Sequence, residues 1–99
     1  MPHVYILECA DGSYYVGSTV DLERRLAEHR LGLGAAYTRR RLPIRLVYSY
    51  ECGRVDEAYS REKQVQGWSR AKREALIRGD LVLLPRLAKK AFPPSPPVE

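Results

Sequence analysis

The chain has 99 residues, enough for one domain with a modest core, and 44% of them are hydrophobic. Its two cysteines are too few for a disulfide scaffold, and they form no recognisable zinc-binding spacing with the two histidines. Seventeen Lys and Arg against twelve Asp and Glu give a formal charge of +5, which suits a polyanionic partner but does not by itself establish one. No stretch has the pattern of a signal peptide or the length of a membrane span, so we expect a soluble, cytoplasmic protein without membrane contacts.

The predicted elements follow the order strand, strand, helix, strand, helix, helix. Strands rich in β-branched and aromatic residues are expected at 3–8, 14–18 and 44–51. Helices are expected from a cap at Thr19 or Asp21 to about residue 31, at 55–66, and from a cap at Ser69 to about residue 78, with a loop at 35–43. This order, ββαβαα, predicts an α/β fold of the α+β sandwich type, in which helices cover a three-stranded, largely antiparallel sheet.

We expect one folded domain over residues 1–92. Its last segment, 81–92, is apolar and basic and is predicted as a short strand or turn followed by a helical turn. Residues 93–99 begin with Pro-Pro-Ser-Pro-Pro and are predicted as a disordered tail.

The loop of the first hairpin decides whether two tyrosines share a face of the sheet. A two-residue turn would place Tyr5 opposite Ser18 and send Tyr15 to the other face. A three-residue loop with Gly12 in the left-handed conformation places Tyr5 opposite Gly17 and makes Tyr15 its diagonal neighbour. We predict the second register, with Gly17 leaving open space above the two rings. Strand tyrosines are more often packing residues, so this pair gains weight from the polar residues predicted below.

The first predicted helix directs two polar side chains toward the sheet. At about 100° per residue, Leu22 and Leu26 define its buried stripe. His29 and Arg25 lie within about 60° of Leu22 on the same face, whereas Arg24 lies on the solvent side. We therefore expect Arg25 and His29 to point inward.

The next helix places an acidic residue within its apolar stripe. The stripe is predicted to consist of Val55, Ala58, Tyr59 and Val65, and Glu62 lies near its middle. A carboxylate that faces the core is costly unless it is paired or bound to a metal. Two interpretations remain open here, an ion pair with an inward arginine such as Arg25, and a ligand for a hard divalent cation such as Mg²⁺.

These residues together resemble a known family. Val4-Tyr5-Ile6 followed by Tyr15-Val16-Gly17 is similar to the paired motif of the GIY-YIG nucleases, and the resemblance extends from residue 3 to about 80. The segment Arg-Glu-Lys-Gln-Val-Gln-Gly-Trp at 61–68 resembles the small stand-alone branch of that family. Val4 and His3 depart from the first half of the motif and Val16 from the second. Many members also carry an asparagine after the metal-binding glutamate, and this chain contains no asparagine.

The resemblance implies an endonuclease that uses one Mg²⁺ or Mn²⁺ ion and hydrolyses phosphodiester bonds, with DNA more expected than RNA and a structure-selective role in repair or recombination. By position it implies catalytic roles for Tyr5, Tyr15, Arg25, His29 and Glu62, with Glu62 as the metal ligand and Gly17 as the motif glycine. Lys72 is a weak substitute for the missing asparagine and a further candidate for contacts with nucleic acid. Related enzymes usually gain specificity from a second domain, so a protein partner or a homodimer is the expected substitute here.

The sequence also suggests how such a site would work. Arg25 would stabilise charge on the phosphoryl group, and Tyr5, with Tyr15 or His29 relaying the proton, would deprotonate the attacking water. A free tyrosine titrates near pH 10, so we expect Arg25 and the metal to lower the pKa of Tyr5 and cleavage to rise with pH.

A basic segment follows the first predicted helix. Arg39, Arg40, Arg41 and Arg45 are candidates for phosphate contacts, with Tyr37 able to stack on a base, although a solvated loop would have the same composition.

Two alternatives to an active nuclease remain at this stage. One is a catalytically weak or inactive nucleic-acid-binding module of the same fold, which would bind tightly without metal-dependent cleavage. The other is a structural or partner-binding domain in which Glu62 and Arg25 form only a buried ion pair.

Overall fold

The computed structural model describes residues 1–79. Its elements are β1 (His3–Glu8), β2 (Tyr14–Thr19), α1 (Leu22–Arg30), α2 (Ala36–Arg39), β3 (Arg45–Glu51), α3 (Val55–Gln66) and α4 (Arg70–Arg78). The chain divides into two compact units, Met1–Glu62 and Lys63–Glu99, with the boundary inside α3. The predicted segment 81–92, the proline-rich tail and the boundary between them lie outside the described residues.

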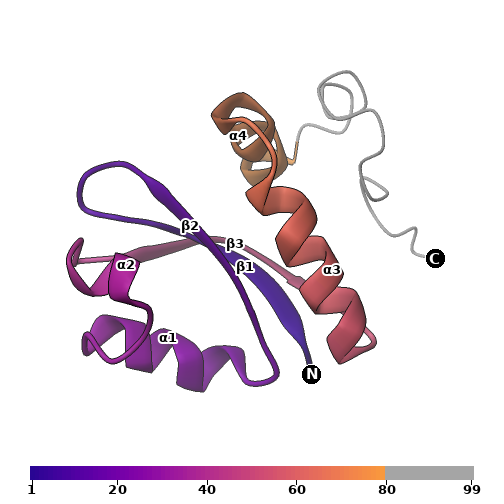
Figure 1. Ribbon diagram of the computed structural model, residues 1–99, viewed down its shortest axis with the longest axis horizontal. Coiled ribbons are helices and arrows are strands. Elements are labelled where there is room, and N and C mark those ends of the chain that lie inside the picture. The colour runs from indigo at the N-terminus through magenta and orange to yellow at the C-terminus, as the bar shows by residue number, and fades with distance from the viewer. Residues whose placement is uncertain (80–99) are drawn as a thin grey trace. The chain divides into compact units, whose positions relative to one another are not determined.

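The three strands form one antiparallel sheet in the order β2-β1-β3, which confirms the predicted fold class (Figure 1). The central strand β1 is buried from Val4 to Leu7, because it has a neighbour on each side and its apolar side chains alternate between two covered faces. Its pairing with β3 shifts by one residue between Ile6 and Leu7, as at a β-bulge. Figure 1 shows α1 along one face of this sheet, with α2 beside the C-terminal end of α1.

The hairpin between β1 and β2 has the predicted three-residue loop. Gly12 is left-handed, with φ of +84°, and its N–H donates to the carbonyl of Cys9 over 2.9 Å. The resulting register places Tyr5 opposite Gly17 and Tyr15 opposite Leu7, so the two tyrosines share one face. This confirms the register that the site requires.

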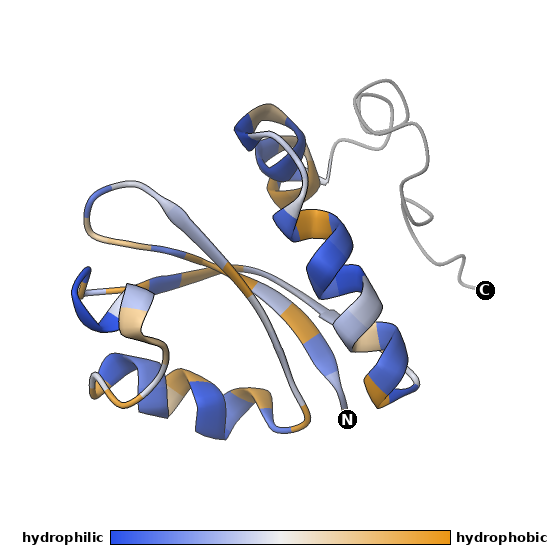
Figure 2. Ribbon diagram, in the orientation of Figure 1, coloured by the Kyte–Doolittle hydropathy of each residue, from blue (hydrophilic) through white to orange (hydrophobic). Residues whose placement is uncertain are grey.

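Helix α1 has the predicted amphipathic character. Asp21 caps it by accepting the backbone N–H of Arg24 over 3.1 Å. Leu26 and His29 are buried, and the side chain of Arg25 is 33% exposed against 77% for Arg24, which confirms the inward direction of Arg25 and His29. Figure 2 shows hydrophilic and hydrophobic segments alternating along α1, as expected for a helix with one covered face. The core on this side consists of Tyr5, Leu7, Cys9, Leu26 and Ile44.

Helix α2 lies within the segment predicted as a loop, and that prediction was wrong for Ala36–Arg39. The helix is a single turn without a side-chain cap at Ala35, so neither periodicity nor a capping signal marks it in the sequence. Its buried residue is Thr38, whose hydroxyl donates to the carbonyl of Ala35 over 3.0 Å.

The apolar stripe predicted for α3 is only partly correct. Ala58 and Val65 are buried, whereas Val55 and Tyr59 are 60% and 56% exposed. Tyr59 lies about 100° from Ala58 around the helix, which places it at the margin of the buried face. Glu62 is half-buried, between Ala58 and Val65 on that face.

In the second unit, α4 agrees with the prediction. Ser69 caps it by accepting the N–H of Lys72 over 3.3 Å, and the left-handed Gly79 ends it. No helix within residues 1–79 combines the length and the apolar character that crossing a bilayer requires.

Candidate active site

The site is organised around Gly17, at the edge strand β2. The phenol of Tyr5 extends from the neighbouring strand across this glycine. A Cβ at position 17 would lie 2.6 Å from the phenol oxygen of Tyr5 and 3.1 Å from Cε2 of Tyr15. The space above Gly17 is therefore filled by the Tyr5 ring and is not open as the sequence suggested. Only glycine lets the phenol cross the strand here.

A buried chain of hydrogen bonds leads away from the phenol. The Tyr5 oxygen lies 2.9 Å from Nε2 of His29, and Nδ1 of His29 lies 2.9 Å from Oγ1 of Thr38. Tyr5 is 1% exposed, and His29 and Thr38 are fully buried. The rings of Tyr5 and Tyr15 meet the imidazole edge-on, at centroid distances of 5.8 and 5.4 Å. Residues of β1, β2, α1 and α2 thus hold the Tyr5 phenol against the His29 imidazole.

The pKa values of Tyr5 and His29 follow from this burial. Burial raises the pKa of Tyr5 to about 12. The nearby Arg25 lowers this pKa, whereas the charges of Tyr15 and Glu62 raise it further. Arg25 does lower the pKa of Tyr5, as expected, but burial outweighs the guanidinium, so Arg25 alone does not bring this pKa below its usual value. The lowering expected from Arg25 and a metal together stays a prediction. Burial, followed by the charge of Arg25, lowers the pKa of His29, so the imidazole is neutral near pH 7.

The guanidinium of Arg25, on α1, contributes a positive charge near the Tyr5 phenol. Its Nη1 donates to Oε1 of Glu28 over 3.0 Å, and its positive charge lowers the pKa of Tyr5. The structure thus pairs Arg25 with Glu28. A half-exposed guanidinium beside the phenol is suited to bind an incoming phosphate.

Glu62 approaches the same strand through the residue that follows Gly17. Ser18 donates its hydroxyl proton to Oε1 of Glu62 over 2.6 Å. Because neighbouring residues of a strand face opposite sides, Gly17 carries the phenol and Ser18 holds the carboxylate. The charges of both Arg25 and Glu62 act on the pKa of Tyr5, which Arg25 lowers and Glu62 raises.

The donor set around Glu62 fits a hard cation with few protein ligands. Within residues 1–79, no cluster of three or more His, Cys, Asp or Glu side chains could enclose a metal ion. Mg²⁺ is commonly held by one or two carboxylates, with water and substrate phosphate oxygens completing its shell. A half-buried carboxylate already oriented by Ser18 matches that requirement.

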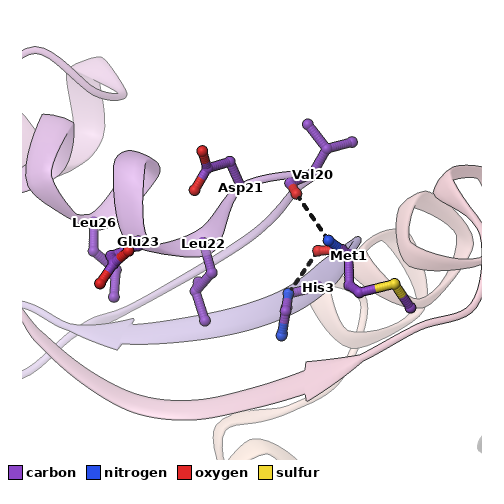
Figure 3. Close-up of a pocket in the computed structure, with 7 residues that line it drawn as sticks. All are labelled: Met1, His3, Val20, Asp21, Leu22, Glu23 and Leu26. Carbon is purple, nitrogen blue, oxygen red and sulfur yellow. Dashed lines mark hydrogen bonds between the residues drawn. The ribbon is translucent and has the colours of Figure 1, made fainter.

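Hollows lie around this part of the first unit. One of about 540 Å³ lies between β1 and the first turns of α1 and contains none of the candidate catalytic residues (Figure 3). Its lining consists of Met1, His3, Val20, Asp21, Leu22, Glu23 and Leu26. A second hollow of about 300 Å³ includes Arg25, and a third of about 130 Å³ includes Ser18. The second and third hollows therefore adjoin the site, and the first does not.

A stack of side chains adjoins Tyr15 on the side of α2. The rings of Tyr15 and Tyr37 are nearly parallel, with centroids 6.1 Å apart, and the guanidinium carbon of Arg41 lies 3.8 Å from the Tyr37 centroid. Nε of Arg41 donates to Asp11 of the hairpin loop over 3.1 Å. Tyr37 therefore already stacks within the protein, and its predicted stacking on a base remains a prediction.

The other predicted nucleic-acid-binding residues differ in their partners. Arg45 pairs with Glu8, whereas Arg39 and Arg40 are exposed and have no acidic partner within the described part of the chain. Lys72 is half-buried on α4 in the second unit, and its role remains a prediction.

Three residues with a part in the site were missed from the sequence. Ser18 contacts the carboxylate, Thr38 contacts the imidazole, and Gly34 adjoins His29 closely enough that a Cβ there would lie 2.4 Å from Nδ1. Ser18 could have been found from its position one residue after the motif glycine. Thr38 and Gly34 had no such signal, because they depend on α2.

Comparison with known proteins agrees with this arrangement. The family model of the GIY-YIG catalytic domain matches residues 1–75. The UPF0213 protein VNG_2274C of Halobacterium salinarum is 49% identical over 77 residues, which are 78% of this chain and 100% of that relative. A UPF0213 protein of Streptococcus pneumoniae is 45% identical over 75 residues, 76% of each chain. The solution NMR structure of the UPF0213 protein BH0048 from Bacillus halodurans aligns with a TM-score of 0.52 and 47% identity, covering 79% of this chain and 84% of that one.

Proposed function

Because this chain belongs to the family of the GIY-YIG catalytic domain, a nuclease family, we propose that it is a divalent-metal-dependent endonuclease. Its substrate is nucleic acid, with DNA preferred to RNA and branched or flapped structures of repair and recombination as the targets. The observation that supports this most strongly is the placement of Tyr5 over Gly17 and of Glu62 on the next residue, Ser18, with Arg25 directed inward from α1. Hydrolysis of a phosphodiester needs a base, a positive charge and a metal ligand, and these three residues would supply them.

In the proposed reaction, Tyr5 acts as a relay and not as a preformed phenolate. A pKa near 12 leaves the phenol protonated at neutral pH, so it has no anionic oxygen to offer. The attacking water gives its proton to the Tyr5 oxygen while the phenol proton moves to Nε2 of His29, 2.9 Å away. The water oxygen bonds to phosphorus as the bond to the leaving oxygen breaks, and the leaving oxygen takes a proton from solvent water. The proton on His29 then returns through Tyr5 to solvent. The lowered pKa of His29 favours that return.

Arg25 is the group that meets the charge on the phosphoryl oxygens. It borders the hollow of about 300 Å³, so a phosphate bound there would contact its guanidinium. A fixed guanidinium stabilises charge that develops in the transition state without reorganisation. The ion pair with Glu28 holds the guanidinium in place.

Glu62 would hold the divalent ion, Mg²⁺ or Mn²⁺, with Ser18 orienting its carboxylate. When bound, such an ion supplies Lewis-acid neutralisation of a non-bridging oxygen and of the leaving oxygen.

The test is cleavage of linear, flapped and branched DNA and of RNA, each with and without Mg²⁺ or Mn²⁺. We expect the wild type to cut DNA only with the metal, and Glu62→Gln to abolish cutting while it keeps the fold. Arg25→Ala should lose activity, whereas Arg24→Ala, its exposed neighbour on the same helix, serves as the matched control. Tight binding without metal-dependent cleavage would instead identify an inactive nucleic-acid-binding module.

A further inference from the structure

The hydroxyl of Thr38 has one proton, and the structure shows where that proton goes. Oγ1 lies 3.0 Å from the backbone carbonyl oxygen of Ala35, which can only accept, so Thr38 donates to it. Oγ1 is therefore the acceptor in its hydrogen bond with Nδ1 of His29, 2.9 Å away. It follows that Nδ1 carries the ring proton and donates to Thr38.

The position of that proton decides what Nε2 can do. A neutral imidazole with its proton on Nδ1 has a bare acceptor at Nε2. The Tyr5 oxygen lies 2.9 Å from Nε2, so the phenol donates to the ring. The three hydrogen bonds thus run in one direction, from Tyr5 through His29 and Thr38 to Ala35.

The slot around His29 allows the ring no other arrangement. Gly34 adjoins one side so closely that a Cβ would lie 2.4 Å from Nδ1 and 2.8 Å from Cε1. The rings of Tyr5 and Tyr15 meet other parts of the imidazole edge-on. A ring that is enclosed in this way and fully buried has no water with which to exchange its partners. The tautomer is consequently set by Thr38.

We propose that Thr38 is a positioning residue that holds the His29 proton on Nδ1 and so keeps Nε2 free to receive the phenol proton of Tyr5. The effect of Thr38 on catalysis rests on the proposed function, whereas the effect of Thr38 on the tautomer of His29 does not. Without the hydroxyl, the N–H at Nδ1 would be buried with no acceptor, which disfavours that tautomer. The proton would move to Nε2 and donate to the Tyr5 oxygen, and the phenol could no longer pass its proton to the ring.

The tautomer can be read directly by ¹⁵N NMR of the histidine ring, in protein without metal or nucleic acid. The wild type should show a protonated Nδ1 and an unprotonated Nε2 on His29. Thr38→Ser keeps the hydroxyl and should keep this pattern, whereas Thr38→Val matches the shape of threonine without the hydroxyl and should move the proton to Nε2. A wild type with its proton on Nε2 would overturn the proposal even if the valine variant does not fold.

Cleavage rates supply the second readout. If Tyr5 passes its proton to His29, Thr38→Val should cut about 10²-fold more slowly, within the range of general-base contributions, and Thr38→Ser should restore a rate close to that of the wild type. A moved proton with an unchanged rate would refute the catalytic role of Thr38. A wild type that cuts no nucleic acid but has the Nδ1 proton would refute the nuclease and support the role of Thr38 in setting the tautomer.

Discussion

The phenol oxygen of Tyr5 lies 2.9 Å from Nε2 of His29, and both side chains are shielded from solvent. This contact determines how the phenol can act as a base. Burial raises its pKa to about 12, so a phenolate is not populated at neutral pH. A phenol that exchanges protons with a neutral imidazole needs no such phenolate, and the predictions below follow from that pairing.

The first prediction concerns acid stability. The pKa of His29 is lowered from 6.5 by burial and by Arg25, while Glu28 opposes the shift. Below pH 6.5 this histidine is protonated in the unfolded chain but binds a proton more weakly in the folded chain. The contribution of His29 to the free energy of unfolding should therefore be constant above pH 6.5. Below pH 6.5 the free energy of unfolding should fall until the pH has passed the lowered pKa of the folded state.

Denaturant titrations between pH 7.5 and 5 measure this dependence. His29→Gln removes the titrating group and should flatten the curve in that range. Cleavage should fall over the same range, because a protonated imidazole cannot receive the phenol proton. An identical pH dependence in the wild type and the glutamine variant would contradict the assignment.

The second prediction concerns the motif glycine. Gly17→Ala would place a Cβ 2.6 Å from the Tyr5 oxygen, and the buried ring must shift to relieve the clash. We expect a loss of about 1–3 kcal/mol in the free energy of unfolding, as for other overpacked cores, together with loss of cleavage. Gly53→Ala is the control, since a Cβ there would meet only Oε1 of Glu57, at 3.9 Å. Equal stability of the two variants would argue against the close approach at Gly17.

The third prediction concerns the carboxylate. Ser18→Ala removes the donor that orients Glu62, and the metal concentration at half-maximal activity should rise by about 10–100-fold, as when other outer-shell partners of metal ligands are removed. Ser13→Ala is a matched control, because the Ser13 hydroxyl donates to Asp11 over the same 2.6 Å in the hairpin loop. If Ser18→Ala needs the same metal concentration as the wild type, Glu62 oriented by Ser18 is not the metal ligand.

The fourth prediction concerns the basic segment. Arg39 and Arg40 can each bind a phosphate without breaking an ion pair, whereas Arg41 must first leave Asp11. Replacing Arg39 and Arg40 together should reduce the slope of log affinity against log salt by about 0.9 for each phosphate of duplex DNA that is no longer bound. Binding is measured with Glu62→Gln so that no cleavage occurs. A slope that changes only when Arg41 is replaced would show that Arg41, and not Arg39 or Arg40, contacts the phosphates.

Local chemistry made much of this fold predictable. The Asp11-Gly12 loop determined the hairpin register, and that register placed Tyr5 and Tyr15 on one face. Helical angle correctly separated the inward Arg25 from the outward Arg24. These inferences needed only the geometry of one loop or one helix.

Features that depend on tertiary contacts were not predictable. The one-turn helix α2 has no capping side chain, so no pattern along the chain indicated that Thr38 would reach His29. The rise in the pKa of Tyr5 comes from burial, which outweighs the neighbouring Arg25. Tyr59 was expected in the apolar stripe of α3, yet it is exposed because it lies at the margin of the buried face.

The most direct test compares two tyrosine variants that each lack one hydroxyl. Burial raises the pKa of Tyr48, on β3, to about 12, as it does for Tyr5, but Tyr48 pairs with Ile6 and lies on the other face of the sheet. Under single-turnover conditions with Mg²⁺ and flapped DNA, Tyr5→Phe should lower the cleavage rate by roughly 10²–10⁴-fold while Tyr48→Phe leaves it unchanged. Equal rates for Tyr5→Phe and the wild type would contradict the central role of the Tyr5 phenol.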